Sequence, residues 1–456
     1  MRLTHPAVRL ALSALLALAF SSCRPAPSPA GQWRGVLTSP GGELPFGLRI
    51  DSGPQGLRAV VQNGPEEAPV SAVELKGHEL VLRFDGYDSR IVATIEGNEL
   101  TGKWEKRAKV GYATLPMVAH RVDTEPAPRF RPASEVGLVT VAASAESAVP
   151  SVSGDWAVAF VDEDGTSPAE AELRQEGTRV TGTFRTPTGD HRFLEGSYER
   201  GILRLSAFDG AHAFLYQAHA EPGGTLRGDF WSRDSYHATW TARRAAEHEA
   251  VLPDAWKEVG LTNPEGRFRF NFPDLAGKTV KLDDPRFAGK VVIVNLFGSW
   301  CPNCNDEGPY LASLHKRYRD RGLEIVGLAF EVTGDAARDR EFVRRFGARY
   351  GISYPLLLAG TNDKEEAGAA LPDLTRVASF PTTVFLGRDG KVRKIHSGFD
   401  GPGTGEHFAE LKKEFEGLIE SLLAEPAPAG ESRISRGIFR TPGSPPGSGD
   451  PDRGAR

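Results

Sequence analysis

The pattern of apolar and polar positions changes near residue 261, and the two parts of the chain predict different kinds of structure. Upstream, short runs such as RVTGTFR (179–185) alternate polar with apolar residues and are broken by Gly, Pro and Asp. This alternation is typical of strands with one buried face that are joined by turns. Downstream, continuous apolar runs alternate with helical patterns as far as residue 423, which predicts an α/β domain.

The upstream part contains one unit twice, over residues 31–121 and 151–244. GQWRGVL at residue 31 corresponds to GDWAVAF at 154, and LVLRFDG at 80 corresponds to LRLSAFDG at 203. The pattern predicts two tandem all-β modules, each a small antiparallel sheet closed into a barrel or sandwich. Five tryptophans could form a ligand platform, but paired aromatic residues in β modules are more often core. They are Trp33, Trp104, Trp156, Trp231 and Trp240.

The α/β domain, residues 261–423, is predicted to hold a mixed sheet flanked by helices. Its strands are KVVIVNLF (290–297), LEIVGLAF (323–330), YPLLLAG (354–360), PTTVFL (381–386) and KVRKIHS (391–397). Helices are predicted over 302–321, 335–351 and 405–423. The unbroken apolar run KVVIVNLF is expected of a strand that is covered on both faces.

The remaining segments read as leader, tether, linker and tail. Residues 1–22 join a basic start to the apolar run LALSALLALAF and end at Cys23. They resemble a bacterial lipoprotein signal, in which the cysteine after small residues is acylated; the alternative is an ordinary secretory signal with Cys23 there by chance. Either signal places the mature protein outside the cytoplasm. We further predict a tether over 23–30, a linker over 122–150 and a disordered tail over 424–456.

Length and composition agree with several soluble domains. The chain has 456 residues, more than one core usually fills, and 39% of them are hydrophobic. Its formal charge of −5 shows no basic excess, so no nucleic-acid partner is expected. Three cysteines are too few for a disulfide framework, and each needs its own explanation.

Two of these cysteines, Cys301 and Cys304, stand in the stretch LFGSWCPNCNDEGP (296–309). A closed zinc site needs four ligands, and no other cysteine lies within about 270 residues. Haem attachment requires histidine where Asn305 stands. A permanent disulfide between residues three apart would close almost no loop and stabilise little. Redox chemistry therefore remains, with no metal and no cofactor other than a Cys301–Cys304 disulfide.

The placement of the pair supports this interpretation. Cys301 lies between a buried strand and a helix, where free N–H groups and the helix dipole favour an anion. Pro302 suits the first helical position. Cys304, one turn further on, can close back onto Cys301 and resolve a mixed disulfide. We therefore predict that Cys301 attacks and Cys304 resolves.

VNLFGSWCPNCNDEGP and SFPTTVFLGRDGKV together resemble the thioredoxin fold, and within it the TlpA/ResA-like thiol–disulfide oxidoreductases of the bacterial cell envelope. The shared features are Trp300, Pro309 and a Phe380–Pro381 step that matches the family's cis-proline. The resemblance implies that Trp300, Phe380 and Pro381 lie beside the dithiol and contact substrate.

The family also has a glutamate at the position of Glu307, three residues after Cys304. The resemblance implies that Glu307 takes the proton from Cys304 when that thiol attacks. A surface position is the alternative for this glutamate, and is the one expected for its neighbour Asp306. Asn295 occupies the place of the buried aspartate of thioredoxin.

The predicted function is disulfide exchange with protein substrates, as a reductant that is lipid-anchored and faces the periplasm. The resemblance implies a membrane thiol electron donor and, often, a role in cytochrome c maturation. A peroxiredoxin-type thiol peroxidase is disfavoured, because Val294 and Gly298 replace the proline and Thr/Ser of its P-x-x-x-T/S-x-x-C motif. Another alternative is a binding lipoprotein whose β modules, which show no recognisable chemistry, carry the function.

Overall fold

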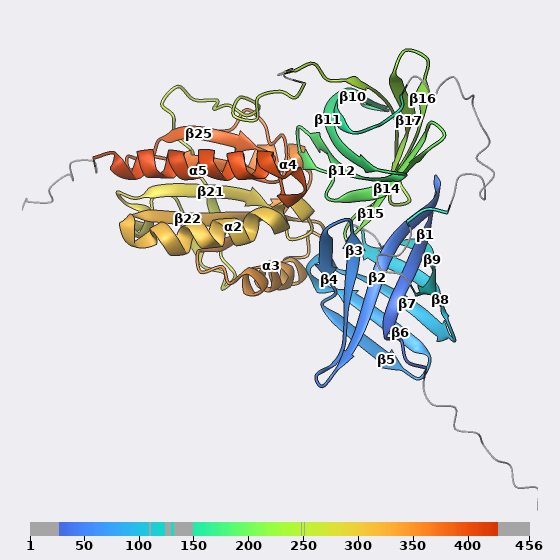
Figure 1. Cartoon of the computed structure of the whole chain (residues 1–456). Coiled ribbons are helices and arrows are strands. Elements are labelled where there is room, and N and C mark those ends of the chain that lie inside the picture. The colour runs from blue at the N-terminus through green and yellow to red at the C-terminus, as the bar shows by residue number, and fades with distance from the viewer. Residues whose placement is uncertain are drawn as a thin grey trace, which may run out of the picture.

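The computed structural model describes residues 27–108, 111–123, 129–131, 149–247, 249 and 251–426. The predicted signal segment, Cys23 and the tail beyond residue 426 lie outside these residues. Two all-β modules and a C-terminal α/β domain pack against one another (Figure 1), which confirms the predicted fold class. Among the described residues, no helix has the length and apolar character needed to cross a membrane.

Module 1 is one antiparallel sheet in the order β4-β3-β2-β1-β9-β8-β7-β6-β5. The sheet is curved, but within the described residues its edge strands β4 and β5 do not pair with each other, so it forms a half-barrel. Its elements are β1 (Gly31–Ser39), β2 (Gly42–Gly53), β3 (Gly56–Asn63), β4 (Glu66–Pro69), β5 (Ala72–Lys76), β6 (Glu79–Phe84), η1 (Asp85–Tyr87), β7 (Ser89–Glu96), β8 (Glu99–Arg107) and β9 (Tyr112–Val122).

Module 2 has the same meander but closes, because β11 also pairs with β12. It is therefore a barrel, with the short strand β13 appended at the rim. Its strands are β10 (Gly154–Asp162), β11 (Gly165–Glu176), β12 (Arg179–Thr186), β13 (Gly189–Asp190), β14 (Leu194–Glu199), β15 (Ile202–Phe208), β16 (Ala213–Glu221), β17 (Thr225–Ser232) and β18 (Tyr236–Arg244).

The two modules repeat the same local contacts. In each, the tryptophan of the first strand donates its indole N–H to a backbone carbonyl four residues upstream, at 2.9 Å. An arginine of the last strand covers the same ring: Arg121 lies 4.3 Å from the ring of Trp33, and Arg244 lies 4.0 Å from that of Trp156. Trp33, Trp104, Trp156 and Trp240 are buried, as predicted for core residues, and Trp231 is half-buried.

The modules share a core across their interface. Phe208 of module 2 inserts into module 1, where its ring lies 4.7 Å from Phe46 and 5.6 Å from Trp104. Arg129, from the predicted linker, is buried at the same boundary, where it forms an ion pair with Glu195 at 3.1 Å and donates to the Pro45 carbonyl. This part of the linker thus fixes one module to the other.

The C-terminal domain holds a five-stranded mixed sheet in the order β23-β22-β21-β24-β25. The central strand β21 is parallel to β22 and antiparallel to β24, and all its residues are buried. The elements of the domain are β19 (Asn271–Pro273), β20 (Thr279–Lys281), η2 (Pro285–Phe287), β21 (Val291–Phe297), α2 (Pro302–Tyr318), η3 (Arg319–Arg321), β22 (Leu323–Glu331), α3 (Ala336–Tyr350), β23 (Leu356–Thr361), α4 (Lys364–Ala370), β24 (Thr382–Leu386), β25 (Val392–Ser397), η4 (Pro402–Thr404) and α5 (Glu406–Ala424).

Candidate active site

The dithiol lies where β21 ends and α2 begins. Cys301 is the N-cap of α2, and its sulfur accepts a hydrogen bond from the backbone N–H of Cys304 at 3.3 Å. Pro302 occupies the first turn, where its missing N–H leaves no helix bond unmade. Both thiols are free and buried, with 5% of Cys301 and 1% of Cys304 exposed. An N-cap sulfur that accepts a hydrogen bond from a helix N–H is well placed to carry negative charge.

The three residues predicted to contact substrate surround Cys301. The Phe380–Pro381 peptide bond is cis, and the Cys301 thiol donates to the Phe380 carbonyl at 3.4 Å. The indole N–H of Trp300 donates to the carbonyl of Phe330 at 2.8 Å, and its ring meets Phe380 edge-on at 6.0 Å. The structure therefore brings Trp300, Phe380 and Pro381 together beside Cys301.

Glu307 lies one turn after Cys304 on α2 and is fully buried. Its carboxylate accepts a hydrogen bond from the Asn295 amide and another from the Thr383 hydroxyl, each at 2.6 Å. Burial nevertheless raises the pKa of Glu307 to about 7, because it disfavours the charged form more than these two bonds favour it. Near neutral pH this carboxyl can therefore either hold or release a proton.

Burial also raises the pKa of the Cys304 thiol well above its usual range. The hydrogen bond and the charge of Cys301 add to this, and the negative charge of Glu307 acts in the same direction. Cys304 therefore stays protonated near neutral pH and needs a proton acceptor before it can attack.

Three polar residues of the site were not predicted from the sequence. Thr383 faces Asn295 across the β21–β24 pair, two residues after the cis-proline. Glu331 ends β22 and accepts from the Ser299 N–H and hydroxyl at 2.8 and 2.7 Å, which fixes the loop before Cys301. The Asn305 amide donates to the carbonyls of Ser299 and Cys301. Glu331 is a polar residue at the end of a buried strand, and this pattern could have indicated from the sequence that it belongs to the site.

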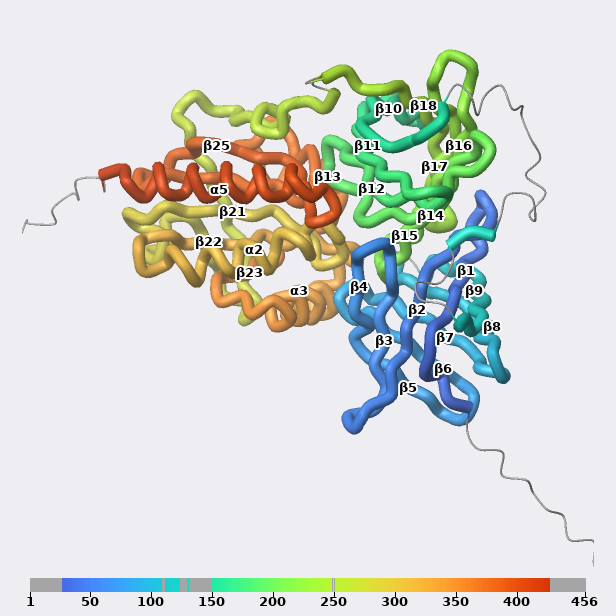
Figure 2. Tube along the Cα trace, viewed as in Figure 1, coloured from blue at the N-terminus to red at the C-terminus, as the bar shows by residue number. Residues whose placement is uncertain are grey.

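Parts of both β modules lie against the C-terminal domain close to the dithiol, and we call these parts, around Gly86 of module 1 and Gly189 and Arg192 of module 2, the roof. The β12–β13 hairpin of module 2 reaches the C-terminal domain (Figure 2), and Gly189, the first residue of β13, has a φ of +139°. A Cβ on Gly189 would lie 1.5 Å from the amide nitrogen of Asn303, the second residue between the cysteines. In module 1, η1 lies against α3, since a Cβ on Gly86 would meet the guanidinium of Arg349 at 2.4 Å. A side chain at either point would have to displace the neighbouring side chain, and at Gly189 it would also strain the backbone.

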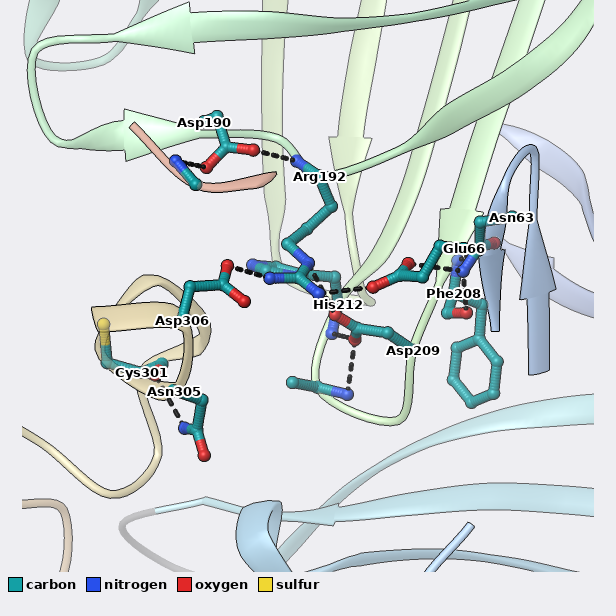
Figure 3. A network of polar contacts seen from close by, with 12 residues as sticks. Asn63, Glu66, Asp190, Arg192, Phe208, Asp209, His212, Cys301, Asn305 and Asp306 are labelled. Atoms are coloured by element: carbon teal, nitrogen blue, oxygen red, sulfur yellow. Dashed lines mark hydrogen bonds and ion pairs between the residues drawn. The ribbon is translucent and has the colours of Figure 1, made fainter. Parts of the chain in front are cut away.

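The prediction of a surface position for Asp306 is wrong. Its carboxylate is 12% exposed and forms an ion pair with Arg192 of module 2 (Figure 3). The same guanidinium forms an ion pair with Glu66 of module 1 and lies 3.6 Å from Asp209, which in turn pairs with His212 at 3.0 Å. Arg192 thus joins both modules to the helix that carries the dithiol.

Several carboxylates surround the single guanidinium of Arg192, so the contact between the three domains depends on its positive charge. Burial raises the pKa of Glu66 and of Asp306, although the nearby guanidinium opposes the shift in both cases. Asp190, which accepts from the Arg192 backbone N–H at 3.2 Å, is also buried and has its pKa raised to about 7. Without the guanidinium, these buried carboxylates would repel one another across the interface.

We therefore expect Arg192→Met to loosen the roof. Removing one partner of a buried ion pair costs about 3–5 kcal/mol. The partners of Arg192 are Glu66 of module 1 and Asp306 of the C-terminal domain. Much of the lost free energy should therefore come from the packing of the three domains against one another. Alkylation of the reduced thiols by iodoacetamide should accelerate by about ten- to a hundredfold, since about 1.4 kcal/mol corresponds to a factor of ten.

Two further variants make this prediction specific. Asp306→Asn removes only the partner on α2 and should accelerate alkylation in the same direction. Arg227→Met removes an exposed arginine of module 2 that pairs with Glu221 at 2.8 Å, and should leave the rate unchanged. Parental alkylation rates in both Arg192→Met and Asp306→Asn would show that the ion pairs do not hold the roof.

The C-terminal domain is similar in sequence to proteins named as thiol–disulfide oxidoreductases. The family model for Redoxin matches residues 259–413. The ResA thiol-disulfide oxidoreductase of Halalkalibacterium halodurans is 30% identical over 149 residues, which cover 33% of this chain and 76% of that protein. The thioredoxin-like protein YneN of Bacillus subtilis is 32% identical over 142 residues, 31% of this chain and 75% of that protein.

Solved structures with similar folds include a thiol:disulfide interchange protein of the thioredoxin family from Chlorobium tepidum. It is 22% identical with a TM-score of 0.28, and the match covers 36% of this chain and 99% of that one. A secreted thiol-disulfide isomerase from Corynebacterium glutamicum is 19% identical with a TM-score of 0.30, covering 40% of this chain and 99% of that one. On the family match and the relatives, this chain belongs to the TlpA/ResA-like thiol–disulfide oxidoreductases, with its dithiol at Cys301 and Cys304.

Proposed function

We propose that the protein reduces disulfides of protein substrates in the bacterial cell envelope. The thiolate of Cys301 attacks one sulfur of the substrate disulfide and releases the other as a thiol. Cys304 then attacks the Cys301 sulfur, releases the second substrate thiol and leaves a Cys301–Cys304 disulfide. Glu307 accepts the proton that Cys304 loses. Trp300, Phe380 and Pro381 contact the substrate around the attacked bond.

The observation that carries the reducing direction is the buried carboxyl beside the dithiol. A strong oxidant of this fold has a reduced form that is stabilised, as a thiolate at a positive site. Here the N-cap favours a thiolate at Cys301, but burial and Glu307 disfavour negative charge on Cys304, so the second thiol adds no such stabilisation to the reduced form. The couple should therefore give up its electrons readily.

The reduction potential of the Cys301–Cys304 couple tests this direction. We expect a value nearer to the about −270 mV of thioredoxin than to the about −120 mV of the oxidant DsbA. Equilibration of the full chain with glutathione or dithiothreitol buffers, followed by alkylation and mass analysis, gives the value. A potential close to −120 mV would reverse the proposed direction of electron flow.

The proposed location rests on the N-terminal sequence. The segment LALSALLALAF followed by SSC resembles a lipoprotein signal, and the Pro-rich residues after Cys23 would serve as a tether. A lipid-anchored protein facing the periplasm would receive electrons from a membrane thiol donor. Cytochrome c maturation is one process that such a reductant would serve.

We expect Cys23→Ala to release the protein from the membrane fraction, because one sulfur would carry the anchor. The measurement is the distribution of the full chain between membrane and soluble fractions after cell breakage. Ser22→Ala changes the adjacent residue and keeps the sulfur, so it should stay with the membrane. Equal membrane retention of Cys23→Ala and the parent would rule out lipidation at this residue.

A further inference from the structure

A cavity of about 290 Å³ lies where module 1, module 2 and the C-terminal domain meet. Its walls include Tyr87 and Lys106 from module 1 and Arg233 from module 2. The C-terminal domain contributes Ser299, Trp300 and Glu331. Because Ser299 and Trp300 directly precede Cys301, the wall of the cavity comes within one residue of the attacking cysteine.

The walls of this cavity carry an excess of positive charge. Across the part of the chain that the structure describes, no carboxylate forms an ion pair with Lys106 or Arg233; the Lys106 ammonium donates only to the Ala211 carbonyl, at 3.0 Å. The charge of Asp88 is shared between Arg107, at 3.2 Å, and Arg338, at 2.7 Å. The remaining acidic residue, Glu331, accepts a hydrogen bond from the Ser299 hydroxyl, and burial raises its pKa to about 7.

An anion in the cavity would stabilise the charged form of Lys106. Burial and, next, the charge of Arg233 lower its pKa to about 7, against the negative charges of Asp209 and Cys301, which raise it. A buried cation without a counter-ion is costly, and a carboxylate placed between Lys106 and Arg233 would remove much of that cost. The two side chains come from different modules, so the site exists only in the assembled chain.

The space around the dithiol suits a small ligand. Cys301 is 5% exposed, Pro381 is buried, and Gly189 of module 2 lies over Asn303, so a protein substrate reaches the thiol only when the modules move aside, whereas a small molecule needs less space. The cavity is at the lower end of the range for small-molecule sites, which is about 300–1,000 Å³. Its volume therefore suits a small molecule.

We propose that this cavity binds a low-molecular-weight disulfide through its carboxylates and presents the S–S bond to Cys301. This second substrate class rests on the dithiol exchange of the proposed function. The Cys301 thiolate attacks one sulfur of R–S–S–R, forms the Cys301–S–R disulfide and expels RS⁻, which takes a proton. Cys304, losing its proton, then expels the second RS⁻ and forms the Cys301–Cys304 disulfide, so one small disulfide receives two electrons and becomes two thiols.

Three disulfides of similar size and different charge test the proposal. They are 3,3′-dithiodipropionate with two carboxylates, bis(2-hydroxyethyl) disulfide without charge, and cystamine with two ammonium groups. Each is mixed with the pre-reduced full chain in a single turnover, and acid quenching with mass analysis gives the rate constant. Division by the rate constant with free dithiothreitol removes the intrinsic reactivity of each disulfide. We expect this normalised rate to be about tenfold higher for the dicarboxylate than for the neutral disulfide.

Variants of the two cations locate the effect. Lys106→Met and Arg233→Gln should each lower the preference for the dicarboxylate over the neutral disulfide by about three- to tenfold. Because the readout is a ratio, a change in the general reactivity of Cys301 does not mimic the result. Arg227→Gln removes an equal charge from β17, where Arg227 pairs with Glu221 at the surface, and should leave the ratio at the parental value.

The possible outcomes separate this inference from the proposed function. A preference for the dicarboxylate that falls in Lys106→Met and Arg233→Gln supports the cavity as the binding site. Equal normalised rates for the three disulfides, or a preference that both variants retain, would refute it and leave disulfide reduction intact. If none of the three disulfides oxidises the dithiol, the proposed exchange itself fails, and the inference fails with it.

Discussion

Cys301→Ser should abolish disulfide exchange, and Cys304→Ser should halt it at a mixed disulfide between Cys301 and the substrate. The N-cap position and the N–H of Cys304 prepare the Cys301 sulfur for attack, whereas burial keeps Cys304 protonated. Without Cys304, no second thiol remains in the site to displace the substrate. The two single variants should therefore differ completely in what they capture.

Capture in living cells measures this difference. Cells that express each variant are quenched with acid, their thiols are alkylated, and adducts are separated without reductant. Cys304→Ser should accumulate reducible adducts, and Cys301→Ser and the double variant should accumulate none above background. Adducts on Cys301→Ser that match or exceed those on Cys304→Ser would exchange the roles of the two cysteines.

The local parts of the site could be predicted because adjacent residues determine them. A buried strand, a CxxC pair and a proline at the first helical turn together place Cys301 at a helix N-cap. The elements of the C-terminal domain follow from the same kind of reasoning, because helical and strand periods are properties of short windows. The predicted helix over 302–321, for instance, is α2 continued by the 3₁₀ turn η3.

The contacts across domains could not be predicted in this way. Asp306 stands among polar residues on a helix, a pattern typical of a solvated face, but its partner Arg192 is 114 residues away on another domain. Thr383 reaches Glu307 only through the pairing of β21 with β24, which no short window specifies. Arg129 lies in a segment whose Ala, Pro and Ser content predicts a linker, yet it is buried between the modules.

The position of the β modules gives them a possible part in controlling access to the dithiol. They contain no cysteine, and their sequences show no recognisable chemistry. The structure nevertheless places Lys106 and Arg233 of these modules in the wall of the cavity beside Trp300, and pairs Arg192 with Asp306 on the helix that begins at the dithiol. Access to Cys301 and the charge of what reaches it would then depend on the modules, while the exchange itself depends on the C-terminal domain.

Glu307→Gln should slow the second half of the cycle, in which Cys304 displaces the substrate, by about 10²- to 10⁴-fold near pH 8. The variant keeps the size of the side chain and removes the group that accepts the proton. Attack by Cys301 should change much less, because the Glu307 carboxylate bonds to Asn295 and Thr383 and the Cys301 sulfur is prepared by the helix terminus. The mixed disulfide should therefore accumulate in the variant.

The pH dependence distinguishes a proton acceptor from a structural residue. The pKa of Glu307 is raised to about 7, so the carboxyl is mostly protonated at pH 6 and cannot accept a proton, but is mostly ionised at pH 8. The pKa of Cys304 lies well above its usual range, so this thiol still needs an acceptor at pH 8. The rate of resolution in the parent should rise between pH 6 and 8, and the ratio of parent to Glu307→Gln should rise with it.

Two control variants sharpen this test. Thr383→Val keeps the carboxyl but removes a hydrogen bond that favours its ionised form, so the midpoint of the pH profile should move upward. Glu365→Gln removes an exposed glutamate from α4 and should leave the profile unchanged. Rapid mixing of reduced protein with a model disulfide, with acid quenching at successive times, separates formation of the mixed disulfide from its decay. A ratio of parent to Glu307→Gln that stays constant from pH 6 to 8 would mean that Glu307 supports the fold without carrying the proton.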